Sequence, residues 1–178
     1  QAPEPCRSCD ARAFSFCSAL RASELARLAA LSDPVSLRPG EALVRAAEPA
    51  GAVFNVTAGT LRVSRALADE RRQVTGFLLR GDFVGFGAGE AYGFTVEAVT
   101  PAALCRFDRR GFTALLDAQP AMERRLLCMA SDELREAREQ QLLLGRKTAA
   151  ERLASFLLAL ARRQARLGAP EDVADLPM

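Results

Sequence analysis

The amino-acid sequence predicts a mainly β protein with helices, in which an antiparallel sandwich or small barrel is followed by long helices. Between residues 35 and 108, short apolar runs alternate with turn signals at roughly ten-residue spacing. After residue 108 the apolar residues recur at helical spacing instead. The 178 residues are 49% hydrophobic, which is ample for a packed core in one or two domains.

The first element is a segment of about twenty residues that carries cysteines and is predicted to be irregular, because Pro3 and Pro5 open it. A short amphipathic helix follows. Ser23 is its predicted cap, and the helix is expected to end before Pro34. The apolar face of this helix is formed by Leu25, Leu28 and Leu31.

The β region begins at Val35 and is predicted to end at Asp108. Its strands include Val53–Val56, Leu61–Val63 and Val74–Leu78. Glycine and proline mark the turns between them, as in Arg38-Pro39-Gly40-Glu41, Ala58-Gly59-Thr60 and Arg80-Gly81-Asp82.

Three helices are predicted after the β region. The first covers Arg109 to Asp117, and the second begins at Pro120 and runs to about Leu144. The third begins at Thr148, where Thr148-Ala149-Ala150-Glu151 has the pattern of a capping box, and it ends before Gly168.

The second of these helices has apolar and small residues at spacings of three and four, flanked by charges of both signs, which is typical of a coiled-coil seam. An amphipathic helix that lies on its own domain would show a similar pattern. A helix of about 24 residues would overhang a small barrel, so we predict a dimer seam. Its residues are Leu127, Ala130, Leu134, Ala137, Gln141 and Leu144.

Three of the five cysteines, Cys6, Cys9 and Cys17, form a C-x2-C-x7-C run near the start of the sequence. The segment is too polar to bury them as core residues, and Arg7 and Arg12 within it favour the thiolate form. With no histidine in the chain, thiolates would hold any metal, which indicates zinc or an iron–sulfur cluster. A single C-x2-C pair with a looser third cysteine favours the cluster over a zinc knuckle.

The other two cysteines are harder to interpret. Cys105 falls on a predicted strand, on the same face as Ala103 and Phe107, and is either a buried thiol or a fourth ligand. Cys128 lies among apolar residues of the long helix and is predicted to serve packing, in the core or at an interface.

Composition excludes several classes of protein. Without histidine there is no Ser-His-Asp or Cys-His catalysis, so we do not expect an enzyme. The odd number of cysteines argues against a secreted disulfide framework, and no apolar run approaches the roughly 18 residues of a membrane span. The sequence therefore predicts a reduced, cytoplasmic protein that does not bind membranes. The net charge of +2 neither favours nor excludes binding to nucleic acid.

The sequence resembles the CRP/FNR family of bacterial transcription regulators, and specifically its oxygen-sensing FNR branch. The resemblance spans nearly the whole chain and implies a jelly-roll barrel like that of cyclic-nucleotide-binding domains, followed by a long dimerisation helix. The residues that carry it are Phe54-Asn55-Val56-Thr57-Ala58-Gly59-Thr60-Leu61, the run from Gln73 to Phe86, and the run from Leu142 to Leu153.

In that branch three N-terminal cysteines and one central cysteine ligate an oxygen-labile [4Fe–4S] cluster. The matching residues are Cys6, Cys9, Cys17 and Cys105, so the resemblance makes Cys105 a ligand. The cluster favours the homodimer that binds promoter DNA and RNA polymerase. The seam can carry an acid that weakens the cluster-free dimer. Here that position is Ala137, so we expect a dimer even without the cluster.

The resemblance also divides the chain. Residues 1–20 would bind the cluster, 21–119 form the jelly roll, 120–146 the dimerisation helix, and 147–178 the start of a C-terminal region. Family members continue into a winged helix-turn-helix, and this sequence ends about where that domain would begin. It is therefore expected to be the sensor and dimerisation part of a regulator.

Two other functions fit the same residues. One is a cyclic-nucleotide-responsive regulator, whose relatives pair a barrel arginine with the cyclic phosphate. Residues 82–105 contain no lysine or arginine, so we expect no cyclic nucleotide to bind. The other is a zinc-stabilised interaction module, for which four thiolates are chemically adequate.

Overall fold

The computed structural model describes residues 4–67, 69, 71–85, 89–144 and 148–170, with the side chains of residues 4, 5 and 139–144 excepted. It contains two compact units, which meet in sequence between Glu123 and Arg124. The first unit holds the N-terminal segment and the sheets, and the second holds most of the long helix and the helix that follows it.

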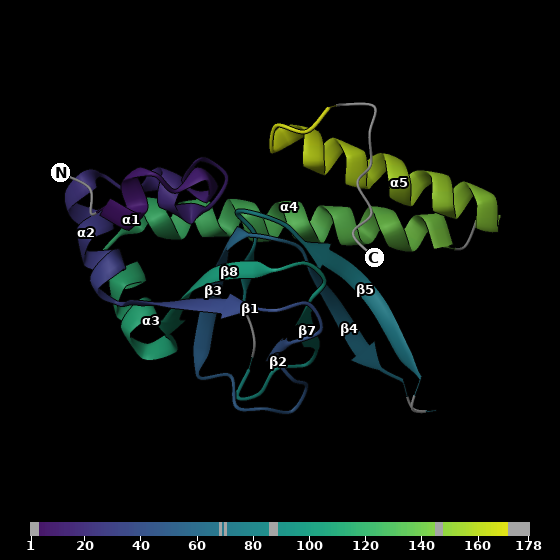
Figure 1. Cartoon of the computed structure of the whole chain (residues 1–178), viewed down its shortest axis with the longest axis horizontal. Helices are drawn as coiled ribbons and strands as arrows, with labels where there is room; N and C mark the ends of the chain where they lie inside the picture. The colour runs from purple at the N-terminus through teal and green to yellow at the C-terminus, as the bar shows by residue number, and fades with distance from the viewer. Residues whose placement is uncertain (1–3, 68, 70, 86–88, 145–147, 171–178) are drawn as a thin grey trace. The chain divides into compact units, whose positions relative to one another are not determined.

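Two four-stranded sheets form the first unit, and every strand pairing in them is antiparallel (Figure 1). One sheet has the order β1 (Ser32–Leu37), β8 (Ala102–Asp108), β3 (Ala52–Ala58), β6 (Phe83–Val84). The other has the order β2 (Ala42–Val44), β7 (Thr95–Ala98), β4 (Leu61–Ala66), β5 (Arg72–Leu78). The predicted antiparallel β fold is thereby confirmed.

The core lies between the two sheets because both contribute their inward-facing apolar residues. Phe54 and Val56 of β3 belong to the same buried cluster as Leu61 of β4 and Val96 of β7. The side chains of a strand alternate between its two faces. The residues of opposite parity on β3 and β8 therefore face out of the barrel, where other segments cover them.

The first strand differs from the prediction, which began the β region at Val35. Strand β1 begins at Ser32 and includes Pro34, which lies opposite Cys105 on β8. Proline has no backbone N–H to donate, so it is tolerated at the edge of a sheet. Strand β1 is such an edge, with β8 as its neighbour.

The helices that follow the sheets agree with the sequence prediction. Helix α3 covers Arg109–Asp117 and helix α4 covers Pro120–Leu144. Helix α5 covers Ala149–Arg166, and the Oγ1 atom of Thr148 accepts a hydrogen bond from the backbone N–H of Glu151 at 3.3 Å. Among the described residues, no helix combines the length and apolar character that crossing a membrane requires.

The predicted start of the first amphipathic helix was wrong. Helix α2 covers Ala22–Ala30, so Ser23 lies inside its first turn and Arg21 holds the cap position. The carboxylate of Glu24 accepts a hydrogen bond from the backbone N–H of Arg21 at 2.8 Å, which closes the turn. Leu25 and Leu28 are buried as expected, whereas Leu31 is 42% exposed.

A half-buried carboxylate links three strands of the second sheet. Glu97 on β7 accepts a hydrogen bond from Nε of Arg62 on β4 at 3.1 Å, and it also contacts the guanidinium of Arg72 on β5. The hydrogen bond from Arg72 lowers the pKa of Glu97 below its ordinary value of 4.5, against the opposing effect of burial. A carboxylate whose pKa is lowered by folding stabilises the folded state at pH values above its unfolded pKa.

We therefore expect Glu97→Gln to lower the free energy of unfolding by about 1 kcal/mol at pH 7. The stabilising effect of the native carboxylate is lost as the pH falls through its depressed pKa, so the two proteins should converge below pH 4.5. Urea unfolding at pH 7 and at pH 4 measures this difference. A gap that is as large at pH 4 as at pH 7 would contradict the ionic origin of the effect.

Candidate metal centre

The N-terminal segment is folded onto the barrel and is not irregular, which corrects the prediction. It forms the short helix α1 (Glu4–Arg7) and two 3-10 turns, η1 (Asp10–Ala13) and η2 (Phe16–Ala19). Turn η1 contacts strand β3. Ala11 and Phe16 have no exposed surface. Burial of these apolar side chains supplies the free energy that orders a segment with little helix propensity of its own.

Phe16 is the main anchor of this segment. Its ring makes edge contacts with Phe83 of β6, Phe112 of α3 and Phe107 of β8, at centroid distances of 5.2, 5.5 and 6.1 Å. Phe107 faces out of the barrel because Leu104, of opposite parity on the same strand, faces the core. Phe16 therefore joins the cysteine segment to the outer face of one sheet and to α3.

A second contact fixes the same segment one turn earlier. The guanidinium of Arg80 lies 5.5 Å from the ring centre of Phe14, and it pairs with the carboxylate of Asp10 at 3.6 Å. Gly81 has a φ of 95°, and a Cβ atom there would stand 2.7 Å from Cβ of Phe14. Glycine is required at this position because the segment packs directly on the backbone.

The four predicted ligand cysteines come together outside the barrel. Every charge effect of one of these cysteines on another raises the pKa of the affected thiol. The charges of Cys105, Cys6 and Cys9 raise the pKa of Cys17, and those of Cys9 and Cys6 raise the pKa of Cys105. Such repulsion between thiolates requires them to be near neighbours. Cys105 is separated by 88 positions in sequence from Cys17, and the docking of Phe16 on β8 brings the two into range.

Burial is the largest influence on these thiols. It raises the pKa of Cys17 to about 12 and that of Cys105 to about 11, and it also raises the pKa of Cys6. The positive charge of Arg12 lowers the pKa of Cys6, but burial and the charge of Cys9 outweigh it. Arg12 thus favours the thiolate of Cys6, as expected, without setting the net direction of its pKa. A metal would have to displace the thiol protons.

The described residues do not present a ready site for a single metal ion. Four sulfurs around one zinc ion stand about 3.8 Å apart, because each is about 2.3 Å from the metal at the corner of a tetrahedron. Among the described residues, no three cysteine, aspartate or glutamate side chains are grouped to hold one metal ion. The cysteines are neighbours, therefore, without forming a closed single-ion site.

The remaining predicted residues lie on helix α4. Cys128 is exposed in the single chain, so of its two predicted roles packing in the core is excluded and packing at an interface stays a prediction. At the seam positions, Leu127 and Leu134 are 53% and 52% exposed, Ala130 is half-buried and Ala137 is exposed. The side chains of Gln141 and Leu144 lie outside the described part of the structure.

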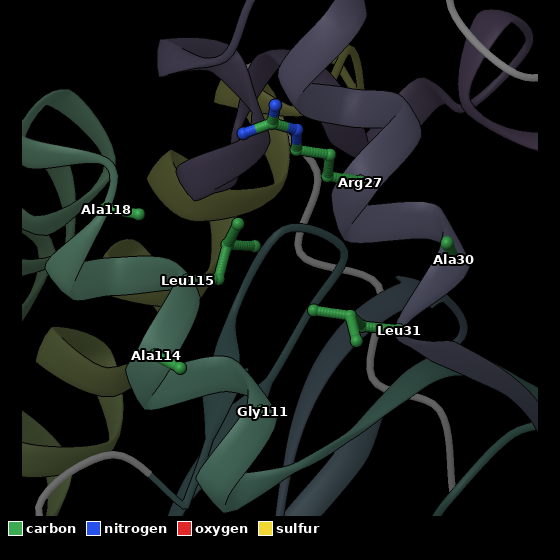
Figure 2. A pocket seen from close by; sticks show the side chains of 7 residues that line it. All are labelled: Arg27, Ala30, Leu31, Gly111, Ala114, Leu115 and Ala118. Atoms are coloured by element: carbon green, nitrogen blue, oxygen red, sulfur yellow. The ribbon is translucent and has the colours of Figure 1, made fainter.

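A shallow apolar pocket of about 450 Å³ lies between helices α2 and α3 (Figure 2). Figure 2 shows Leu31, which directly follows α2, across from Leu115 of α3, and Arg27 of α2 is the charged residue of the pocket lining. No pattern in the sequence predicts this pocket. The anchor Phe16 was also missed, although one signal was available: apolar residues alternate with serine in Phe14-Ser15-Phe16, between the second and third cysteines.

Comparison with known proteins identifies the family. Residues 34–119 match the family model for the cyclic nucleotide-binding domain. The nitrogen fixation regulation protein FixK of Bradyrhizobium diazoefficiens is 34% identical over 173 residues, which cover 97% of this chain and 73% of that protein. The transcriptional activator protein FnrL of Cereibacter sphaeroides is 36% identical over 177 residues, which cover 97% and 71%.

The solved structures that this chain resembles include regulators of the same kind as its sequence relatives. The structure of FixK2 from Bradyrhizobium japonicum matches with a TM-score of 0.72 and 35% identity, over 83% of this chain and 72% of that one. The sensor domain of the regulator DNR from Pseudomonas aeruginosa shares the fold, with a TM-score of 0.63 at 22% identity. The chain belongs to the CRP/FNR family of transcription regulators.

Proposed function

We propose that this regulator senses oxygen through a [4Fe–4S] cluster held by Cys6, Cys9, Cys17 and Cys105. The observation that carries the proposal is the convergence of four thiols from two distant parts of the chain: Cys6, Cys9 and Cys105 each lie near enough to Cys17 to raise its pKa. Deprotonated at once, these four thiols would repel one another, and a bound metal cluster would offset that repulsion.

The donor set fits such a cluster. The chain has no histidine, and the four thiols are half-buried rather than fully exposed or fully buried. A bound cluster would supply an oxygen-reactive group at this position. The residues of the chain would hold the four sulfurs in place: β8 carries Cys105, and the ring of Phe16 positions the neighbouring Cys17.

Phe16 also connects the cysteine segment, through α3, to the start of the predicted dimerisation helix α4. Phe16 contacts Phe112 of α3, and α3 is followed after two residues by α4. A change in the docking of the cysteine segment would therefore alter the packing of α3 and the start of α4. The leucines of α4 that are exposed in the single chain, Leu127 and Leu134, would pack against a second copy. We propose a cytoplasmic homodimer that binds promoter DNA and contacts RNA polymerase.

The test is an analysis of metal and sulfide under exclusion of oxygen. The protein is prepared anaerobically, its iron, acid-labile sulfide and zinc are measured, and its visible spectrum is followed after air is admitted. About four irons and four sulfides per chain, with a spectrum that bleaches in air, are expected. Zinc without sulfide would overturn the proposal in favour of a zinc-stabilised module.

Single cysteine variants identify the ligands. Cys17→Ser and Cys105→Ser should each abolish stable assembly, because a partly ligated cluster is lost readily. Cys128→Ser is the matched control, since its thiol is exposed on α4. Iron and sulfide contents near those of the wild-type chain are expected for Cys128→Ser. Full assembly in Cys105→Ser would show that the central cysteine is not a ligand.

A further inference from the structure

Asn55 is a buried polar residue at the predicted cluster site with no role so far. It lies on β3, is 2% exposed, and stands opposite Cys105 on β8 and Phe83 on β6. Residues directly opposite each other on antiparallel strands share a face, with Cβ atoms about 4.5–5.5 Å apart. The amide of Asn55 and the thiol of Cys105 are therefore neighbours on the outer face of the sheet.

The cysteine segment covers this face. Turn η1 contacts β3, and Phe16 packs on Phe83 and Phe107, which flank Asn55 and Cys105 on the same face. The parity of the strand confirms the direction, because Phe54 and Val56 on either side of Asn55 belong to the barrel core. The Asn55 side chain thus lies between the sheet and the segment that carries the other three cysteines.

The amide is not satisfied where it lies. Its Oδ1 atom is fully buried and accepts no hydrogen bond from any described residue. A buried polar atom without a partner costs about 1–3 kcal/mol, and such atoms in folded proteins usually mark an absent ligand, water or functional strain. A valine or leucine would fill this position on an apolar face without that cost.

We infer that Asn55 donates an amide N–H hydrogen bond to the sulfur of Cys105 when that sulfur is a thiolate ligand. The inference rests on the proposed function. A thiol is a weak acceptor, whereas a thiolate is a strong one, so the bond gains its strength when the metal displaces the proton. The buried, unpaired atom is the acceptor Oδ1, and a half-turn of the terminal amide exchanges Oδ1 with Nδ2, so that the NH2 group would face the sulfur instead.

This hydrogen bond would tune the cluster and would not hold it. Donors to ligand sulfurs stabilise the form with more negative charge, so they raise the reduction potential. Asn55→Leu keeps the branched shape of the side chain, at a somewhat larger volume, and removes the donor. We expect this variant to retain its iron and sulfide while its midpoint potential becomes more negative, with about a tenfold change in the redox equilibrium, or about 59 mV for one electron.

A packing control separates this effect from a general disturbance of the face. Val53 lies two residues earlier on the same face of β3, is 2% exposed, and stands opposite Phe107. Val53→Ala should destabilise the fold and leave the potential unchanged. Asn55→Ala serves as a second variant if Asn55→Leu does not fold. An unshifted potential in a cluster-loaded Asn55 variant overturns the inference and leaves the proposed function intact.

A measurement on the cluster-free chain tests the Asn55–Cys105 hydrogen bond separately from the proposed cluster. Alkylation at each cysteine is followed by mass spectrometry at a series of pH values up to about 11, where the Cys105 thiolate forms. The Asn55 variants should react about tenfold more slowly at Cys105 and at the wild-type rate at the exposed Cys128. If the wild-type chain assembles no cluster, the proposed function fails, and equal rates at Cys105 in the wild-type and variant chains then overturn the hydrogen bond as well.

Discussion

Replacing Phe16 with alanine is expected to lower the free energy of unfolding of the first unit by about 3–5 kcal/mol. The ring has no exposed surface and contacts Phe83, Phe107 and Phe112. Its removal would leave a cavity bordered by the sheet and α3. The cavity could be filled only if α3 moved toward the sheet. The loss comprises the burial of the ring and its edge contacts with three aromatic neighbours.

The chain offers a convenient probe for this measurement. Tyr92 is its single tyrosine, there is no tryptophan, and the Tyr92 hydroxyl donates a hydrogen bond to the carbonyl of Ala52 within the barrel at 2.7 Å. Tyrosine fluorescence in urea therefore reports the unfolding of the barrel. Phe156→Ala, at a ring that is 37% exposed on α5, is the control and should leave that transition in place.

The same variant also tests the role of the segment. Without Phe16 the cysteine segment loses its main attachment, so Phe16→Ala is expected to assemble much less iron and sulfide than the wild-type chain under conditions in which its barrel is still folded. Wild-type stability in Phe16→Ala would show that the segment does not dock through this ring. Full cluster content in a destabilised protein would show that docking and ligation are independent.

The sequence was sufficient for elements that carry their own local signals. The proline at the start of α4 and the capping box at Thr148 set helix boundaries through their own backbone chemistry, and both were predicted. The apolar alternation of β3, β4 and β5 likewise predicted their strands. These signals act over a few residues, so they can be interpreted without knowing the partner segment.

The site was harder to predict because it depends on contacts between distant residues. The cysteine segment lacks a periodic apolar pattern, and two residues, Ala11 and Phe16, provide its fully buried apolar contacts. Nothing local to Asn55 indicates that Cys105 is its neighbour, because the register of β3 against β8 sets that pairing. The resemblance to the FNR branch predicted which cysteines converge, whereas the thiol pKa values depend on burial that only the fold determines.

The second large effect is expected at the predicted seam of α4. Ala137→Asp should weaken the cluster-free dimer about a hundredfold or more, because a two-fold seam places the two copies of the acid next to each other. Like charges that face each other across an interface cost several kcal/mol, and about 2.7 kcal/mol already corresponds to a hundredfold change in dissociation constant. Ala137 is exposed in the single chain, so the substitution should leave the monomer folded.

Sedimentation equilibrium of the cluster-free chain measures this constant, and Ala121→Asp is the matched control. Ala121 is also exposed on α4, sixteen residues earlier, which places it about 160° around the helix from Ala137 at 3.6 residues per turn. An acid there also suits the first turn of a helix. A wild-type chain that is only monomeric would refute the cluster-independent dimer. Equal dissociation constants for the two variants would refute the seam, because only one of these positions should face the partner.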